Sequence, residues 1–401
     1  MSVPHSVSGP LNGIVVLDLG QIYNGTYCTF LLARAGATVI KIEPPGGENM
    51  RRRGVVGGAM LPFAMLNSNK NFVTLDLKSE GGRDLFLAMA KKADVVVENF
   101  APGVMDRLGI GPERLRADNP RLIYAAGSGY GWSGPYRDYP AMDLTVQAMS
   151  GVMTTTGYPD GPPTKAGPAL CDFFGGVHLY GAVTTALFER ERTGEGRFVE
   201  VSMLESVYFS LSSSLGLHFG SKGEGPPRTG NRHGGLAESP YNVYPASDGW
   251  VALICVTEAH WSALLQAMER PDLTKDPRFA TLRDRVRHMD QVDEIVSAWT
   301  SGFAKEDLFA LLLRHRLPCA PVRDLGEVTT DPHLIARGAL RRVDHPALGE
   351  VVLPTGAMRF DPEPPPLQPS KELGADNESI LREWLGLDEA EYRAHREAGV
   401  F

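Results

Sequence analysis

Cysteine is scarce in this sequence, and its spacing excludes two common kinds of fold. The chain has 401 residues but only four cysteines, Cys28, Cys171, Cys255 and Cys319. They are too few for a disulfide scaffold and too far apart for the paired CxxC ligands of a zinc ribbon. We therefore expect reduced thiols, as is usual for a protein of the cytoplasm.

Long apolar runs and an excess of positive charge are also missing. No apolar run reaches the roughly 18 residues of a membrane-spanning helix. The N-terminus (MSVPHSVSGPLNG) lacks the basic segment and apolar core of a secretory signal. The formal net charge is −8, from 40 lysines and arginines against 48 aspartates and glutamates. We expect a soluble cytoplasmic protein that binds neither membranes nor nucleic acid.

Several signatures of nucleotide, metal and hydrolase chemistry are absent as well. The turn at residues 20–25 (GQIYNG) lacks the G-x-G-x-x-G pattern, so NAD binding has little support, although Glu43 stands where a ribose-binding acid would lie. No Walker A, HExxH or G-x-S-x-G sequence occurs, and the ten histidines form no cluster with ligand spacing. We therefore expect no metal site.

The first 130 residues alternate between short apolar runs and helical patterns. Strands are expected at Gly13–Asp18, Ala37–Glu43, Phe72–Leu77, Asp94–Asn99 and Arg121–Ala126, with helices between them. This alternation predicts a doubly wound α/β sheet. In such sheets ligands bind beyond the carboxyl ends of the strands.

The rest of the chain divides at a loop rich in glycine, proline and basic residues. A long helical pattern covers 172–192 and a strand covers Phe198–Ser202, before the loop at 220–235. Strands and helices of a smaller α+β unit follow it. We place a large domain at 1–220, a small α+β domain at 221–325 and a C-terminal segment at 326–401.

Asp172 opens the long helix, and the local sequence allows it two roles. Aspartate is a favoured N-cap residue, which is a purely structural role. At the same position, the positive end of the helix dipole would keep a partly buried carboxylate ionised and able to act as a nucleophile. The local sequence alone favours the structural role.

Several polar and basic residues follow predicted strands near the ligand edge of the sheet. Arg51–Arg53, Lys70 and Arg107 could hold phosphates together, although each alone could be a solvated surface charge. Asn99 and Phe100 end the fourth strand, where they would suit the wall of a nucleotide or pantetheine site. Ordinary turn chemistry is the alternative for these two residues.

Several segments together carry a family resemblance. In chain order they read LNGIVVLDLG, AGATVIKIEPPGG, LNSNKNFVTLDLK, ADVVVENFAPGVMDRLG, TTGYPDGPPTKAGPALCD and RTGEGRFVEVSMLES. Over nearly the whole chain, the sequence resembles the class III CoA-transferases, or CaiB/BaiF family. The resemblance implies a Rossmann-like large domain with an inserted smaller α+β domain, and an interlocked homodimer.

The resemblance also implies roles for individual residues. Asp172 matches the family nucleophile, which reverses the preference for a structural role. A glycine-rich lid over the site would contain Gly230, Arg232, His233, Gly234 and Gly235. Contacts with CoA are expected from Ile22, Tyr23, Lys70, Asn99, Phe100 and Arg107. Pro44 stands where the family often has a basic residue, and Arg51 or Arg52 is expected to supply that charge instead.

The implied reaction moves CoA from an acyl-CoA thioester to a free carboxylic acid, with CoA as substrate and no tightly bound cofactor. Anhydride and aspartyl-CoA thioester intermediates would form on Asp172. The lid lacks the four-glycine run of oxalate-using members, which favours another small organic or dicarboxylic acid. The alternatives are a non-catalytic binding protein and an α-methylacyl-CoA racemase or acyl-CoA isomerase of the same fold. Met142 replaces the histidine base of the racemases.

Overall fold

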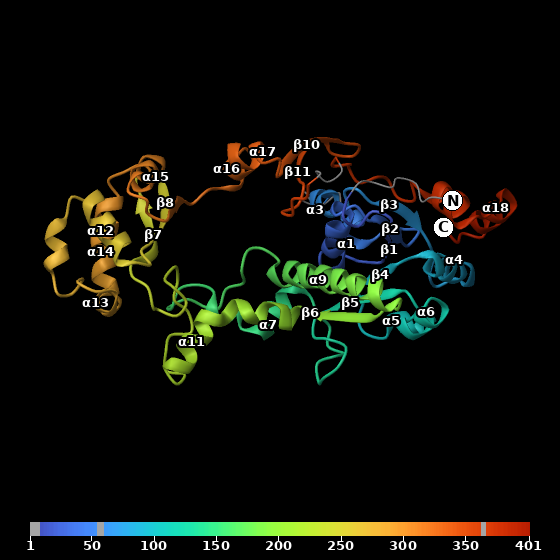
Figure 1. Ribbon diagram of the computed structural model, residues 1–401, viewed down its shortest axis with the longest axis horizontal. Coiled ribbons are helices and arrows are strands. Elements are labelled where there is room, and N and C mark those ends of the chain that lie inside the picture. The colour runs from blue at the N-terminus through green and yellow to red at the C-terminus, as the bar shows by residue number, and fades with distance from the viewer. Residues whose placement is uncertain (1–8, 54–59, 362–365) are drawn as a thin grey trace. The chain divides into compact units, whose positions relative to one another are not determined.

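The computed structural model describes residues 9–53, 60–361 and 366–401 (Figure 1). The chain divides into two compact units. Unit 1 comprises Met1–Gln147, Pro168–Val207 and Thr329–Phe401, and unit 2 comprises Ala148–Gly167 and Tyr208–Val328. The predicted domain boundaries at 220 and 325 differ from these bounds. The main segment of unit 2 begins earlier, at Tyr208, and unit 2 also includes Ala148–Gly167, which precedes Asp172 in the sequence.

Unit 1 contains a six-stranded parallel sheet in the order β3-β2-β1-β4-β5-β6. The chain order of neighbouring strands reverses between β1 and β4, which is where ligands bind in sheets of this kind. The predicted α/β sheet is confirmed, with small shifts at the strand ends. The strands are β1 (Val15–Asp18), β2 (Thr38–Glu43), β3 (Asn71–Thr74), β4 (Val95–Glu98), β5 (Ile123–Ser128) and β6 (Phe198–Ser202).

Helices cover both faces of this sheet (Figure 1). On one face, α1 (Asn24–Arg34) packs against α9 (Leu170–Thr193) through an apolar cluster that includes Leu32 and Leu179. On the other face, α4 (Glu80–Lys92), α6 (Pro112–Asp118) and the C-terminal helical turn η3 (Ser379–Leu385) contribute Phe86, Leu115 and Trp384 to a second cluster. Burial on both faces explains why the strands read as continuous apolar runs.

Shorter elements complete unit 1. A β-hairpin of β10 (Leu340–His345) and β11 (Gly349–Pro354) was not predicted from the sequence. The remaining helices are α2 (Asn49–Arg52), α3 (Met60–Leu66), α5 (Val104–Arg107), α7 (Asp143–Ser150), which crosses the unit boundary, α17 (Pro332–Ala336) and α18 (Glu389–Glu397).

Unit 2 has its own sheet and its own core. Strands β7 (Tyr241–Ala246), β8 (Gly249–Ile254) and β9 (Cys319–Pro321) pair in an antiparallel sheet. The core includes Tyr244, Trp261, Leu264 and Val292. Helix α10 (Met203–Tyr208) belongs to unit 1 except for its last residue, Tyr208. The helices of unit 2 are α8 (Val152–Thr155), η1 (Phe209–Leu211), α11 (Ser212–Gly220), α12 (Glu258–Ala267), η2 (Pro271–Lys275), α13 (Leu282–Arg287), α14 (Met289–Thr300), α15 (Lys305–Arg314) and α16 (Leu325–Thr329), whose last residue lies in unit 1.

Three expectations from the sequence can be compared with the structure. The four cysteines are free thiols, as predicted. Within residues 9–53, 60–361 and 366–401, no helix has the length and apolar character needed to cross a bilayer. In the same described ranges, no three His, Cys, Asp or Glu side chains are grouped so that they could hold a metal ion.

Candidate active site

The turn after β1 is tied to the end of β4, where the sheet order reverses. The Gln21 N–H donates to Asn99 Oδ1 over 2.7 Å, and Asn99 Nδ2 donates to the Gln21 carbonyl over 2.9 Å. The next residue, Ile22, has a φ of 59°. A β-branched residue rarely adopts this left-handed conformation. Strained backbone of this kind concentrates at functional sites, and here Asn99 helps to hold it in place.

Asp172 lines a cavity of about 140 Å³ at this crevice, which we call the Asp172 cavity. It is the third residue of α9, and Ala169 is the N-cap, so Asp172 does not have the capping role that the local sequence favoured. Instead Asp143 accepts a hydrogen bond from the Cys171 N–H over 2.9 Å. The other walls include Gln21, Ile22, Asn24, Asn49, Asn99, Gly127, Met142 and Met203.

The carboxylate of Asp172 has no hydrogen-bond or ion-pair partner among the residues that the structure describes. Burial raises the pKa of Asp172 to about 7, and the negative charge of Asp143 contributes to this rise. Burial and Asp143 therefore act against the helix dipole, which was expected to keep Asp172 ionised. The carboxylate gains its charge only near neutral pH and then has free lone pairs with which to attack.

Glycines allow the start of α9 to approach the start of α1 closely. A Cβ atom at Gly176 would lie 2.7 Å from the Asn24 carbonyl oxygen, so a larger residue would push the two helices apart. Tyr23, the N-cap of α1, stacks on Phe173 with the ring centroids 5.7 Å apart. This packing places Ile22 and Tyr23 beside Asp172, although they are distant in sequence.

Two polar side chains of the Asp172 cavity were missed by the sequence analysis. Asn24 is 1% exposed, and in the described part of the chain its Oδ1 has no hydrogen-bond partner. The Gln21 side-chain amide likewise has no partner there. Both residues lie in the first turn after β1, next to Ile22 and Tyr23. The resemblance carried over only positions that match the family pattern, so it gave no reason to select them.

A second, larger cavity of about 490 Å³ shares Gln21 as a lining residue with the Asp172 cavity. Its walls are mostly apolar and include Phe100. Three cations, Arg52, Lys78 and Arg107, also line it, together with Glu43, Glu48 and Asp76, of which Glu43 pairs with Arg51. Lys78 and Arg107 have no side-chain partner among residues 9–53, 60–361 and 366–401. This cation-lined cavity suits a ligand with an apolar arm and phosphate groups.

Lys70 does not line the cation-lined cavity, although the resemblance predicted a CoA contact for it. It is 2% exposed. Its Nζ lies 2.8 Å from Asp18 Oδ2, 2.8 Å from Thr29 Oγ1, 3.0 Å from Asn67 Oδ1 and 3.2 Å from the Thr26 carbonyl. An ammonium group has three donors, so these four oxygens leave none for a phosphate. Burial lowers the pKa of Lys70 to about 8, and Asp18 opposes this shift.

Arg51 is also engaged within the protein. Its guanidinium donates to both carboxylate oxygens of Glu43, over 3.0 and 2.8 Å, and to the Lys371 carbonyl over 3.0 Å. It also lies over the ring of Phe63. Arg51 and Arg52 were the two candidates to replace the basic residue that is missing at Pro44, and of these Arg52 lines the cation-lined cavity. Lys78, which the sequence analysis did not select, lines it too.

The predicted lid residues belong to unit 2. Arg232 pairs with Asp290 and Asp293 over 2.6 and 2.7 Å, so its charge is already balanced. His233 packs against Tyr241 with ring centroids 5.4 Å apart, and its Nδ1 accepts a hydrogen bond from the Gly235 N–H. Gly230 has a φ of 62°, which favours glycine.

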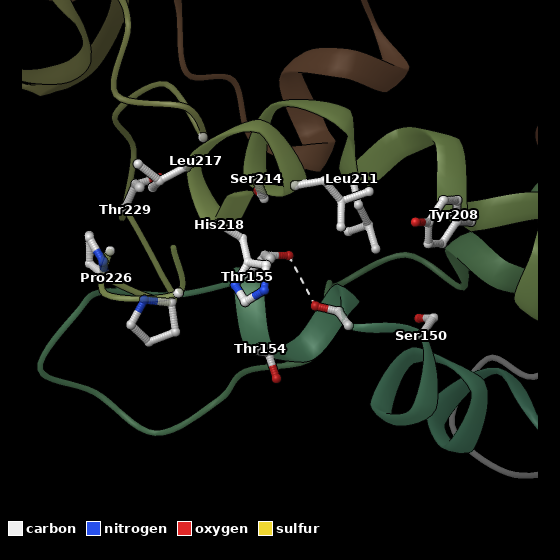
Figure 2. A pocket seen from close by; sticks show the side chains of 16 residues that line it. Ser150, Thr154, Thr155, Tyr208, Leu211, Ser214, Leu217, His218, Pro226 and Thr229 are labelled. Carbon is white, nitrogen blue, oxygen red and sulfur yellow. Dashed lines mark hydrogen bonds between the residues drawn. The ribbon is translucent and has the colours of Figure 1, made fainter. Parts of the chain in front are cut away.

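Unit 2 also contains a cavity of about 390 Å³, which the sequence did not predict (Figure 2). Gly234 and Thr229 line it, together with the hydroxyl groups of Thr155 and Ser214. The Thr155 hydroxyl donates to the Gly151 carbonyl over 3.2 Å. The rings of His218 and Tyr208, both labelled in Figure 2, line the cavity as well, so it can offer hydrogen bonds to a polar ligand.

The fold and the site together define the class of the protein. A parallel α/β sheet carries, at its switch point, an unpaired carboxylate beside a cation-lined cavity, as an enzyme acting on a phosphate-bearing ligand requires. The model of CoA-transferase family III matches residues 11–377. The chain therefore belongs to this family, as the resemblance implied, and it is a CoA-transferase.

Individual relatives agree with this assignment. The chain is similar to the acetyl-CoA:oxalate CoA-transferase of Acetobacter aceti, with 40% identity over 342 residues that cover 84% of this chain and 87% of that protein. It is 35% identical over 385 residues to the succinyl-CoA–D-citramalate CoA-transferase of Chloroflexus aurantiacus, covering 95% of both. A solved CaiB/BaiF family structure from Brucella suis matches with a TM-score of 0.82 and 32% identity, covering 94% of this chain and 99% of that one.

Proposed function

We propose that the protein transfers CoA from an acyl-CoA thioester to a small dicarboxylic acid, with Asp172 as the nucleophile. One observation carries this proposal: the Asp172 carboxylate lacks a counter-ion and lies beside the cation-lined cavity, with Gln21 shared between the two. A reactive carboxylate and a site for a phosphate-bearing ligand are the two parts that CoA transfer through an aspartyl intermediate requires.

The cation-lined cavity would hold the nucleotide end of CoA. Arg52, Lys78 and Arg107 provide positive charge for the phosphates, and Phe100 provides apolar surface. The pantetheine arm would then pass Gln21 and bring the thioester to Asp172. Binding energy from the distant nucleotide would position the thioester for attack.

The first half of the reaction would load CoA onto Asp172. The carboxylate attacks the thioester carbonyl of the donor, which forms a mixed anhydride and breaks the carbon–sulfur bond to release CoA thiolate. The thiolate attacks the aspartyl carbonyl of the anhydride. The donor acid leaves with the bridging oxygen, and Asp172 becomes a CoA thioester.

The second half would transfer CoA to the acceptor. The acceptor carboxylate attacks the aspartyl thioester, which forms a second anhydride and releases the thiolate again. The thiolate attacks the acceptor's own carbonyl, and Asp172 leaves as a carboxylate that keeps one acceptor oxygen. The thioester bond is conserved in this exchange, so no ATP is needed.

The class of acceptor rests on the relatives. The two related enzymes are named for oxalate and D-citramalate, and both acids carry two carboxylates. The missing glycine run argues against oxalate, whereas the name of the Acetobacter relative favours it. Dicarboxylic acids as a class are consistent with both observations.

Racemisation is less well supported by the cavity. Met142, which stands where the racemases have a histidine base, lines the same cavity as Asp172. A thioether cannot accept and return a proton at neutral pH, so one of the two required bases is missing. Incubation of an acyl-CoA in deuterated water without an acceptor acid would leave the α-hydrogen in place if the enzyme is a transferase.

An interlocked homodimer is also part of the proposal, through family membership. Large apolar side chains of unit 2 would be covered by a partner: Phe209 is 82% exposed and Phe219 is 72% exposed. Multi-angle light scattering should give twice the chain mass at micromolar concentration. A monomer at that concentration would contradict this part of the proposal.

A matrix of donors and acids tests the function. Acetyl-, formyl- and succinyl-CoA would each be mixed with oxalate, succinate, glutarate or citramalate, and with acetate as a monocarboxylate control. Mass spectrometry of the acyl-CoA products should show transfer to at least one dicarboxylic acid and much less to acetate. Preference for acetate, or no transfer to any acid, would contradict the proposed acceptor class.

The site for CoA can be tested separately. Lys78→Gln/Arg107→Gln should raise the KM for the donor roughly tenfold or more, because each lost contact to a charged phosphate weakens binding by about 1.5–3 kcal/mol. The kcat should change little, since neither residue touches Asp172. Arg337→Gln/Arg341→Gln removes the same charge from another part of unit 1 and serves as the matched control.

A further inference from the structure

The side-chain amide of Asn24 has an acceptor atom that the proposed function does not use. Asn24 lines the Asp172 cavity and is 1% exposed, and in the part of the chain that the structure describes its Oδ1 has no hydrogen-bond partner. A buried acceptor without a partner costs free energy, and native proteins contain few of them. Such an atom in the wall of a cavity indicates that a ligand supplies the missing donor.

The orientation of this amide is set by its surroundings. Asn24 Nδ2 donates to the backbone carbonyl of Asp172 over 3.5 Å. A Cβ atom at Gly127 would collide with Oδ1, and one at Gly175 would collide with Nδ2. Two glycines, one on β5 and one on α9, therefore make room for the amide. Its Oδ1 lies against Gly127, which also lines the Asp172 cavity.

The candidates for the missing donor are the substrates that would meet at Asp172. A carboxylate and a thioester carry acceptors only, so neither reacting group can donate to Oδ1. The amide N–H of the pantetheine arm would arrive from the cation-lined cavity, and Asn24 is not among the residues that line that cavity. The donor that remains is a hydroxyl group on the acceptor acid itself.

We propose that Asn24 selects acceptor acids that carry a hydroxyl group, with Oδ1 accepting a hydrogen bond from that group. The inference rests on the proposed function and narrows its acceptor class to hydroxydicarboxylic acids. No lysine, arginine or histidine is among the described residues that line the Asp172 cavity, so hydrogen bonds distinguish one acid from another there. The cavity volume of about 140 Å³ suits a small acid, since a cavity of about 150 Å³ accommodates benzene.

The hydroxyl group should affect the rate of transfer. A site with a buried hydrogen-bonding atom discriminates against an analogue that lacks the matching group, because the protein atom is then left unpaired. Malate and succinate differ by one hydroxyl group. We therefore expect kcat/KM to be at least about tenfold higher for one enantiomer of malate than for succinate.

A competition experiment with the full-length enzyme tests the inference. Each enantiomer of malate is mixed in equal amount with carbon-13-labelled succinate and a donor acyl-CoA. Mass spectrometry of the two acyl-CoA products gives the ratio of the two kcat/KM values. Asn24→Ala should bring this ratio to within about twofold of one, because the acceptor atom is lost. The ratio is internal to each reaction, so a general loss of activity does not change it.

Asn99→Ala is the matched control for this variant. Asn99 lines the same cavity, but both polar atoms of its amide are already bonded to the backbone of Gln21. Its loss should slow transfer to both acids and leave the ratio unchanged. Asn24→Leu, which keeps most of the side-chain volume, is the second variant if Asn24→Ala does not fold. The melting temperature of each variant checks folding.

Four outcomes would overturn the inference. Equal use of malate and succinate by the unmodified enzyme would do so and leave the transfer function intact. An unchanged preference for malate in both Asn24 variants would remove Asn24 from the selection. An unchanged preference with a raised KM for the donor would assign Oδ1 to the pantetheine amide. No product from either acid would overturn both the inference and the dicarboxylic acceptor class.

Discussion

Two aspartates of unit 1 have opposite surroundings, and the comparison separates a structural carboxylate from a reactive one. Asp18 lies 2.8 Å from the Lys70 ammonium and 4.0 Å from that of Lys41. Burial alone would raise the pKa of Asp18, but the charges of Lys70 and Lys41 lower it. Asp172 has no such cation, and its pKa is raised to about 7. Neighbouring cations, rather than burial, decide which carboxylate is free to react.

The Asp18 cluster also positions the crevice. The Gly20 N–H donates to Asp18 Oδ1 over 2.7 Å, and the Thr29 hydroxyl of α1 donates to Oδ2 over 2.8 Å. Lys41 donates to the Gly20 carbonyl over 2.6 Å. The hydrogen bonds of the Asp18 cluster therefore fix the turn after β1, and this turn contains Gln21, which lines the Asp172 cavity.

The largest expected effect is that of removing the unpaired carboxylate. Asp172→Ala should lower CoA transfer at least about a thousandfold, as is usual when a covalent nucleophile is lost. The affinity for CoA, measured by calorimetry, should stay within a few-fold of the original, because the cation-lined cavity is intact. Transfer at near-normal rate by this variant would remove Asp172 from the mechanism.

Removing the paired carboxylate should act on stability instead. Asp18→Asn leaves Lys70 buried without its counter-charge, which typically costs about 3–5 kcal/mol. Urea unfolding measures this loss. Asp118→Asn, which breaks the exposed pair with Arg114, is the matched control and should change the free energy of unfolding by less than about 1 kcal/mol. Similar small losses in both variants would mean that the buried cluster is not structural.

A smaller effect on stability should appear at Asp172 itself, with the opposite sign. Its pKa is about 7 in the folded protein, whereas an ordinary aspartate has a pKa of 3.8, so the free energy of unfolding falls as the pH rises from about 4 to about 7. Asp172→Asn removes this cost and should stabilise the protein by on the order of 2 kcal/mol at pH 8, allowing for partial solvent screening. The gain should shrink at pH 5, and a pH-independent difference would contradict the raised pKa.

The smallest expected effect concerns the influence of Asp143. Asp143→Asn removes a negative charge that helps to raise the pKa of Asp172. The acidic limb of the pH profile of kcat/KM should therefore move to lower pH, by up to about one unit. Gln147→Ala, which removes a donor to Asp143 without changing the charge, tests whether geometry alone moves the limb. An unshifted limb in Asp143→Asn would mean that burial alone sets the pKa.

Much of the fold could be predicted because its signals are local. The buried strands of unit 1 and helix α9 follow from short apolar runs and helical periodicity. The β10–β11 hairpin was missed because its strands lie half exposed and carry many charges. Strand β9 was missed because it is short and contains Pro321, although an edge strand accepts proline.

The site was less predictable, because a cation's availability depends on partners that are distant in sequence. Nothing local shows that Lys70 pairs with Asp18, because Asp18 ends β1 and Lys70 precedes β3, on either side of β2. Arg51 pairs with Glu43 only because the turn after β2 brings α2 back to the end of that strand. The same limit applies to Lys78, which reaches the cation-lined cavity through the turn after β3. The family resemblance selected Asp172, and its pKa depends on Asp143, a residue of α7.

A single turnover with an oxygen-18-labelled acceptor acid tests the central claim most directly. The enzyme is first loaded with a donor acyl-CoA, then mixed with the labelled acid, quenched and digested for mass spectrometry. Transfer through an aspartyl thioester predicts one labelled oxygen in the peptide that carries Asp172, because its carboxylate keeps an oxygen of the acceptor. Label that appears only in the released donor acid, with none on Asp172, would show direct attack of the acceptor on the donor and contradict the account.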